Sequence, residues 1–296
     1  ESGAAEAPPA DPVEEIARWH QNRDEMGKSS VVSPFTAVNS WYVDAGATAH
    51  LGADASGIRK DPASPMEAMA DVTYRDDAFT VAPVAGAKPP TVHPYDDEGE
   101  PEAEGADVTA PHKVTEDEAV GLGRDFLEMS PQSGFGRIIA YDPEAPARKA
   151  FTGFKWFPPD PGLAVKATWK PDPAPSEMKV ATSRGLEKTF YRAGRFEFEI
   201  DGKPEALTGL SDTQKPEPGD GLFVPFQDAT TGKETYEVGR YLPARIPKEG
   251  DEATLDFNKA TNPLCNYSPH YNCPIPPKEN RLDVAIRAGE MAYPKP

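Results

Sequence analysis

Side chains that do much of protein chemistry are scarce in this sequence. Its 296 residues include two cysteines and five histidines, and 31 lysines and arginines stand against 49 aspartates and glutamates, for a net charge of −18. Such a surface repels phosphate groups, so a nucleic-acid partner is disfavoured, as is an anionic membrane surface. Basic proteins and divalent cations are the partners that this charge attracts, while solubility or adaptation to salt is the simpler explanation.

Long hydrophobic runs are missing as well. No stretch of about 18 apolar residues occurs, so the sequence predicts no transmembrane segment. Residues 1–10 are small, acidic and proline-rich, and we interpret them as a flexible tail that follows a removed export signal. The same tail is compatible with a lipid anchor before Glu1. These features predict an exported protein, periplasmic or extracellular.

The motifs of several enzyme classes are also missing. There is no G-x-S-x-G nucleophile elbow, no G-x-x-x-x-G-K-[ST] phosphate loop, and no G-x-G-x-x-G that opens a helix after a strand. Whether the chain is an enzyme stays open at this point, with the balance toward a protein without catalysis. We expect no cofactor.

What the sequence has in abundance is proline, 34 residues, which disfavours long helices and central strands. One helix is predicted over residues 11–27, where Asp11 can cap, Pro12 suits the first turn and Gly27 can end it. His20 on its apolar face is expected to be packed rather than to bind a ligand. Residues 115–129 start like a helix but contain two glycines, so their structure stays ambiguous.

Elsewhere the hydrophobic pattern has a period of two residues, which is typical of strands. In FEFEID, residues 196–201, apolar and acidic side chains alternate as in an antiparallel strand with one wet face. The predicted strands are 33–43, 71–81, 134–142, 163–170, 194–201, 221–228, 235–243 and 253–258. We therefore predict a mainly β fold, an antiparallel sandwich or distorted barrel with an N-terminal helix and long Pro-rich loops. It would form one domain over residues 11–296.

Residues 96–107, DDEGEPEAEGAD, contain seven acids and no base. By composition they form a solvated or disordered insert, and they match a calcium loop poorly. If the insert is ordered, we expect a neighbouring subunit to hold it.

The C-terminal third resembles a known family. FQDATTGKETYEVGRYLP, residues 226–243, and LDFNKATNPLCNYSPHYNCPIPPKENRLDVAIRAGE, residues 255–290, are similar to the bacterial domain-of-unknown-function family 1684. FTGFKWFPPDPGLAVKATW, GRIIAYDPEAPARKAF and SPFTAVNSWYVDAGATAHLG extend the resemblance over nearly the whole chain. It implies a compact β-rich protein, exported or envelope-associated, and no particular chemistry. The positions that it singles out are Trp156, Asp228, Thr230, Gly232, Tyr236, Gly239, Arg240, Asp256, Asn258, Asn262, Cys265, Cys273, Pro274, Pro277, Glu279, Asn280 and Glu290.

The two cysteines flank a histidine in a C-x4-H-x2-C pattern. In an exported chain an even number of cysteines favours a disulfide, here Cys265–Cys273, closing a loop without regular structure. The alternatives are a reduced structural pair, or a zinc site or a nucleophilic centre on Cys265, His270 and Cys273. Zinc would need a further ligand such as Asp256 or Glu279, so no metal is favoured.

A polar block between residues 228 and 240 has two interpretations. It can be a β-hairpin in which Asp228 bonds the turn and Arg240 pairs with a carboxylate such as Asp256 or Glu279. It can instead be a small-ligand pocket in which Arg240 and Asp228 bind the ligand and Tyr236 and Trp156 form the walls.

Together these observations predict a non-catalytic exported accessory or binding protein. It would dock onto other envelope proteins, basic or membrane-embedded subunits of a complex. The alternatives are a small-ligand binding protein that uses the pocket at Arg240, Tyr236 and Trp156, and a hydrolase or metalloenzyme centred on Cys265, His270 and Cys273.

Overall fold

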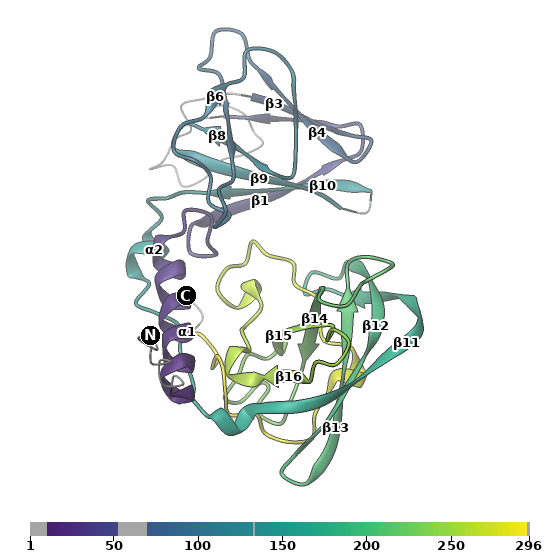
Figure 1. Cartoon of the computed structure of the whole chain (residues 1–296). Coiled ribbons are helices and arrows are strands. Elements are labelled where there is room, and N and C mark those ends of the chain that lie inside the picture. Colours follow the sequence, from purple (N-terminus) through teal and green to yellow (C-terminus); the bar gives the residue numbers. More distant parts are fainter. Residues whose placement is uncertain (1–10, 53–69, 133, 295–296) are drawn as a thin grey trace, which may run out of the picture. The chain divides into compact units, whose positions relative to one another are not determined.

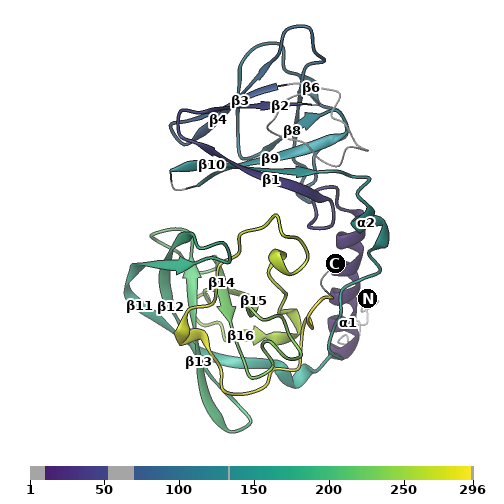
Figure 2. The same cartoon turned by 180° about the vertical axis from the view of Figure 1, so that it is seen from behind.

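A computed structural model describes residues 11–52, 70–132 and 134–294 (Figures 1 and 2). The predicted tail over residues 1–10 therefore lies outside the described residues. The chain divides into two compact units, where the sequence suggested one domain. One, the barrel unit, comprises Glu1–Glu25, Gly153–Tyr267 and Asn272–Pro296, and the other, the sandwich unit, comprises Met26–Thr152 and Ser268–Tyr271. Each is described by itself below.

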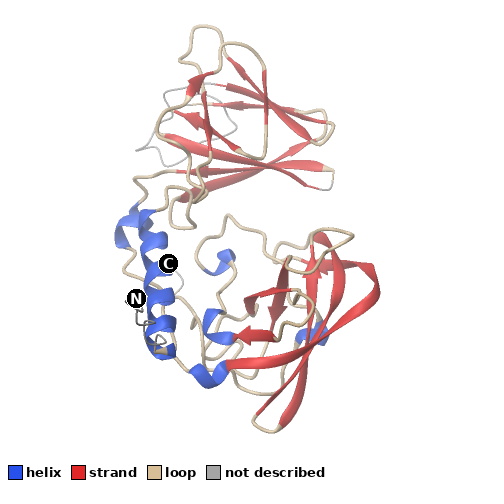
Figure 3. Ribbon diagram, in the orientation of Figure 1, coloured by secondary structure: helices blue, strands red, loops and turns tan. Residues whose placement is uncertain are grey.

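The fold is mainly β, as predicted, and the described strands form three antiparallel sheets (Figure 3). The principal helix, α1, spans Pro12–Ser29. It begins as predicted, because Asp11 accepts a hydrogen bond from the Val13 N–H at 2.9 Å. The predicted stop at Gly27 is wrong by two residues, since the helix continues to Ser29. No described helix is long and apolar enough to cross a bilayer.

The sheet of the barrel unit has six strands. In spatial order they are β15 (Arg240–Arg245), β14 (Gly221–Phe226), β13 (Lys203–Ser211), β12 (Glu187–Ile200), β11 (Ala164–Ala181) and β16 (Ala253–Asp256). The alternation predicted for FEFEID is confirmed: Phe196, Phe198 and Ile200 are buried, whereas Glu199 is exposed.

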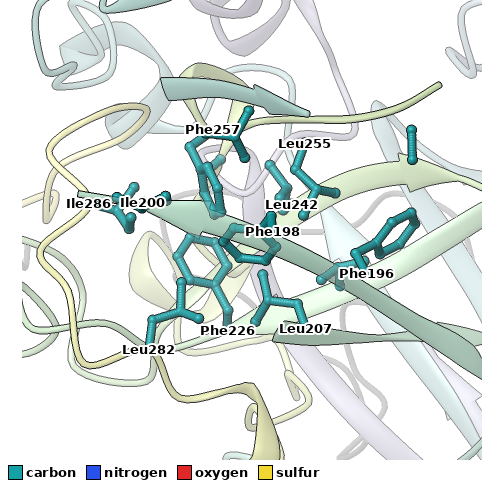
Figure 4. Packing of buried hydrophobic residues seen from close by; sticks show 14 of the residues in the cluster. Phe196, Phe198, Ile200, Leu207, Phe226, Leu242, Leu255, Phe257, Leu282 and Ile286 are labelled. Carbon is teal, nitrogen blue, oxygen red and sulfur yellow. The ribbon is translucent and has the colours of Figure 1, made fainter. Parts of the chain in front are cut away.

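The barrel is nearly closed because its two edge strands meet through the segment after β16. Tyr241 of β15 and Thr261 exchange backbone hydrogen bonds at 2.8 and 2.9 Å. Short 3-10 turns connect the remaining segments: η1 (Pro161–Leu163), η2 (Phe257–Lys259), η3 (Leu264–Asn266) and η4 (Lys278–Asn280). Figure 4 shows the core that this sheet encloses, in which Phe196, Phe198 and Phe226 belong to one cluster with Leu282 and Ile286 of the C-terminal segment. The C-terminal segment thus completes the barrel core.

The sandwich unit has two sheets. The larger contains, in order, β1 (Ala37–Asp44), β10 (Phe135–Tyr141), β9 (Asp125–Gln132), β8 (Glu118–Leu122), β5 (Thr91–Pro94) and β6 (Ala106–Asp107). The smaller contains β2 (Thr48–Leu51), β3 (Ala70–Arg75), β4 (Ala78–Pro83) and β7 (His112–Val114). Their apolar faces share one core, to which Val72 and Val81 contribute from the smaller sheet and Leu127 and Ile138 from the larger. A short helix, α2 (Pro146–Ala150), follows β10.

One predicted strand is wrong, one segment left open is now assigned, and one strand of the barrel unit was not predicted. The predicted strand 71–81 is a hairpin, β3–β4, because Asp76 and Asp77 both have positive φ, 51° and 54°, as a two-residue turn requires. The ambiguous segment 115–129 forms strands, β8 and the start of β9, and not a helix. Strand β13 was missed, although it pairs with β12 along its length. Its first three residues are Lys-Pro-Glu, a composition poor in strand formers.

Candidate functional site

Asp228 and Arg240 meet in the core of the barrel unit, between the end of β14 and the start of β15. Their side chains are 0% and 1% exposed, and Arg240 Nη2 lies 2.9 Å from Asp228 Oδ2. Arg240 also donates to the carbonyls of Ile286, at 2.8 Å, and Ala288, while the Ile286 N–H donates to Asp228 at 2.9 Å. Burial lowers the pKa of Arg240, and the carboxylate of Asp228 opposes that shift.

This geometry supports the hairpin interpretation of residues 228–240. Asp228 Oδ1 accepts hydrogen bonds from the Thr230 N–H at 3.0 Å and the Thr230 hydroxyl at 2.6 Å, which is an Asx-type turn. The partner of Arg240 is Asp228, so the expected pairing with Asp256 or Glu279 is wrong. The hairpin interpretation did not pair Asp228 with Arg240 because it used Asp228 only to bond the turn. In the structure, Oδ1 of Asp228 bonds the turn and Oδ2 pairs with Arg240.

The four residues of the predicted ligand pocket take part in three separate sets of contacts. Arg240 and Asp228 form the buried pair. Trp156 stacks on His20 of α1, with ring centroids 4.0 Å apart, and its Nε1 donates to Asp24 at 3.1 Å. The hydroxyl of Tyr236 donates to the backbone carbonyl of Cys265 at 3.4 Å. The Arg240 side chain is almost inaccessible to solvent, and its hydrogen bonds go to Asp228 and to backbone carbonyls.

The predicted disulfide is not formed: Cys265 and Cys273 are held as thiols. The one-turn helix η3 directs the backbone N–H of Cys265 to the Cys273 sulfur at 3.2 Å. Cys273 is fixed from the other side, since its N–H donates to the Ser183 hydroxyl at 3.1 Å and its carbonyl accepts from the Ser183 N–H at 2.9 Å. The loop is therefore held by hydrogen bonds to the end of β11, a support that the spacing of the cysteines does not reveal.

The third residue of the pattern, His270, belongs to the sandwich unit, where its carbonyl accepts a hydrogen bond from Arg137 at 2.5 Å. Within the described residues, no group of three or more histidine, cysteine, aspartate or glutamate side chains is placed to hold a metal ion. The set Cys265, His270 and Cys273 is thus not assembled as a metal centre, because the backbone of this loop turns its members to different partners.

A buried carboxyl close to the cysteine loop carries no signal in the local sequence pattern. Glu290 is 0% exposed, and its Oε2 accepts hydrogen bonds from the Tyr267 hydroxyl and from the Asn262 N–H, the latter at 2.7 Å. Burial raises its pKa to about 7, against the opposing effects of these donors and of Arg23. Among the described residues no hydrogen-bond partner reaches Glu290 Oε1. Since it is sealed from solvent, this acid can couple protons to stability but cannot reach a substrate.

The acidic insert, residues 96–107, is held by hydrogen bonds within its own chain. Asp96 Oδ1 accepts hydrogen bonds from the backbone of Glu98 at 3.0 Å and of Glu100 at 2.8 Å. His93 on β5 bonds the carbonyl of Glu102 at 2.7 Å, and the Glu100 carboxylate accepts from the Val31 N–H at 2.7 Å. The insert is a fixed acidic loop.

Beside this loop lies an open cavity of about 450 Å³, wholly within the sandwich unit. Its lining includes Tyr95, Gly99, Glu116 and Glu128. Burial, followed by the charges of Glu128 and Glu100, raises the pKa of Tyr95, so the phenol stays neutral beside two carboxylates. Sequence reasoning missed the cavity, since its residues come from strands and loops that only the sheet brings together.

The chain is thus a mainly β protein whose sequence-predicted polar residues are largely tied into the framework of a nearly closed barrel. Residues 149–291 match the family "Protein of unknown function (DUF1684)", and the chain belongs to that family through this domain. The match includes the strands of the barrel unit and stops short of the predicted resemblance over residues 33–52.

Among solved structures, the chain is similar to the solution NMR structure of an uncharacterized protein of Haloarcula marismortui. The two are 37% identical over 49% of this chain and 79% of the other, with a TM-score of 0.41. No curated protein matches the chain.

Proposed function

We propose that this chain is a non-catalytic accessory protein that binds a basic protein partner through the sandwich unit. The observation that carries the proposal is the fixed acidic loop, residues 96–107, beside a cavity in which Glu116 and Glu128 lie among largely apolar lining residues. A rigid loop loses little conformational entropy on binding, and a field of one sign speeds encounter with a partner of the other.

The cavity suits a cationic side chain of that partner. Its walls combine an aromatic ring, Tyr95, with the carboxylates of Glu116 and Glu128. An arginine or lysine can pack its stem against the ring and place its charge near the carboxylates. Anchors of this kind dominate many protein interfaces.

The barrel unit supports the proposal by contrast. Arg240, the strongest candidate for gripping an anionic ligand, is buried against Asp228 and backbone carbonyls. The Cys265 N–H donates a hydrogen bond to the Cys273 sulfur, and the Cys273 N–H donates one to the Ser183 hydroxyl. These residues serve as a framework, which favours an accessory role over a small-ligand pocket or a metalloenzyme.

An exported location, periplasmic or extracellular, belongs to the proposal and rests on the resemblance to envelope-associated proteins. Fractionation of the source cells decides it, because the proposal requires the mature chain outside the cytoplasm.

The binding test uses charge reversal on the acidic face. Asp97, Glu98 and Glu116 are exposed, and changing all three to lysine is expected to weaken binding of an arginine-rich peptide at least about tenfold in calorimetry at low salt. The matched control changes Glu187, Glu217 and Glu249, exposed acids of the barrel unit, to lysine. Both variants alter the net charge equally, so equal loss of affinity in the two would refute a site on the sandwich unit.

A further inference from the structure

The cysteine loop carries an observation that the accessory role does not use. Cys265 is partly exposed, whereas Cys273, eight residues later, is buried with 6% of its surface exposed. The Cys265 N–H donates to the Cys273 sulfur at 3.2 Å, and hydrogen bonding by the Cys273 side chain lowers the pKa of the Cys265 thiol. One cysteine is therefore partly accessible, and the other is buried next to it.

Other donors surround the Cys265 sulfur. The Tyr236 hydroxyl lies 3.7 Å from it, and the Ser183 hydroxyl donates to it as well. Hydrogen bonds to sulfur stabilise the thiolate more than the thiol, and the thiolate is the nucleophile. Reactive cysteines are typically partly exposed residues whose sulfur has several hydrogen-bond donors around it.

We propose that Cys265 is a covalent modification site for soft electrophiles of the activated-alkene class. In the reaction, the thiol proton passes to solvent and the thiolate attacks the β-carbon of an α,β-unsaturated carbonyl. A carbon–sulfur bond forms as the carbon–carbon π bond breaks, its electron pair moves onto the carbonyl oxygen, and solvent returns a proton to the α-carbon. No electron donor or acceptor is needed, and the thioether stays on the protein.

The roles of the two cysteines differ in this site. Cys265 supplies the reacting sulfur, while Cys273 is a positioning residue that acts through its hydrogen bond. That bond is the largest of the effects that lower the pKa of Cys265 to about 7, with burial acting in the opposite direction. Tyr236 and Ser183 lower the pKa further. The pH at which the thiolate forms therefore reports on Cys273 directly.

The experiment treats the intact, folded chain with N-ethylmaleimide between about pH 5.5 and pH 9 and follows the adduct by mass spectrometry. We expect the first adduct at Cys265, with a rate that reaches half of its maximum near pH 7. For the chain unfolded in urea the midpoint is expected near about 8.5. At pH 7 the folded chain is expected to react about threefold faster, because a larger thiolate fraction outweighs the lower nucleophilicity of a less basic sulfur.

Two variants of Cys273 distinguish its effect as a hydrogen-bond donor to Cys265 from a general effect on the fold. Cys273→Ser keeps a donor behind Cys265 and is expected to leave the midpoint near its wild-type value, whereas Cys273→Ala removes the donor and is expected to raise it. Cys265→Ser is expected to abolish rapid labelling of the folded chain. Circular dichroism confirms that each variant is folded, and the wild-type comparison of folded with unfolded chain stands without any variant.

Three results would overturn the proposal. One is a midpoint for the folded chain equal to that in urea. Another is labelling of Cys273 as fast as that of Cys265. The last is an unfolded, unreduced chain without reactive thiols, which would mean that the cysteines are joined in a disulfide.

Discussion

At the scale of single residues, the chain buries several polar side chains in its interior. Arg240 is the bulkiest of the fully buried side chains among the described residues. A buried guanidinium is costly to remove from water, and here Asp228 and three backbone carbonyls compensate for that cost. Such a pair is stable only as a complete set, because removal of one partner leaves the other charge buried.

The first prediction tests that dependence. Arg240→Met preserves much of the side-chain volume but leaves the Asp228 carboxylate without its cation. We expect a loss of about 3–5 kcal/mol in the free energy of unfolding, measured by urea denaturation. Arg287→Met is the matched control, because Arg287 pairs with Glu234 at the surface, and we expect its unfolding midpoint to stay at the wild-type value. Similar midpoints for the two variants would contradict the assignment of Arg240 to the framework.

The second prediction concerns Glu290. Its pKa is about 7 in the folded chain and about 4.3 when unfolded, so the folded chain binds more protons between these values. The stability that this proton binding contributes is complete below about pH 4 and is lost as the pH rises through 7. The difference corresponds to about 4 kcal/mol.

Glu290→Gln, a neutral isostere, is expected to remove this part of the pH dependence. Urea denaturation of both chains between about pH 5 and pH 8 measures it: the wild type should lose stability relative to the variant as the pH rises. Glu187→Gln, at an exposed position, serves as the control. A constant difference between wild type and Glu290→Gln across the range would show that Glu290 is already ionised in the fold.

At the scale of elements, the C-terminal segment substitutes for missing strand pairing. The ladder between β13 and β14 has a single paired position, Leu210 with Phe223. The amide of Asn280, in η4, accepts a hydrogen bond from the Thr208 N–H at 2.7 Å and donates to the Thr208 carbonyl at 3.0 Å and the Pro225 carbonyl at 2.8 Å. One side chain thus satisfies backbone groups of both strands where the ladder stops.

The third prediction follows from this bridge. Asn280→Ala leaves one N–H and two carbonyls in the barrel interior without their partner, and we expect it to cost about 3 kcal/mol of unfolding free energy. Asn272→Ala is the matched control, since Asn272 accepts only one hydrogen bond described here, from the exposed Arg184 N–H. Hydrogen exchange gives the local readout: the Thr208 amide should lose protection in Asn280→Ala and keep it in the control.

At the scale of the whole molecule, the net charge of −18 acts on both units. Like charges repel more in the compact state than in the unfolded chain, and salt screens this repulsion, with a Debye length of about 10 Å at 0.1 M. The acidic surface therefore favours solubility and basic partners at some cost in stability.

The fourth prediction is that added salt stabilises the protein. Raising sodium chloride from about 0.05 M to about 0.5 M should increase the thermal unfolding midpoint by a few degrees. A variant in which the exposed Glu15, Glu187, Glu217 and Glu249 become lysine carries a charge of −10, that is −18 plus 8, and its midpoint should rise less. An equal rise in both chains would mean that salt acts through burial of apolar surface and not through charge.

The sequence alone was enough for the class of fold. Alternation in residues 196–201 predicted a strand with one buried face, and the capping pattern at Asp11 and Pro12 predicted the start of α1, because both depend on contacts between near neighbours in the chain. The hairpin around Asp228 was predicted for the same reason. The resemblance in the C-terminal third identified the family from local motifs.

What the tertiary structure decided were the partners of residues far apart in the chain. It paired Arg240 with Asp228 and with the carbonyls near residue 286, gave Glu290 its raised pKa, and placed Glu116 and Glu128 around one cavity. It also kept Cys265 and Cys273 as thiols although their spacing suggested a disulfide, because a one-turn helix directs a backbone N–H to the sulfur. Sequence patterns record the period of a strand and the residues of a turn, but burial and pairing depend on which strands become neighbours, and only the folded chain determines that.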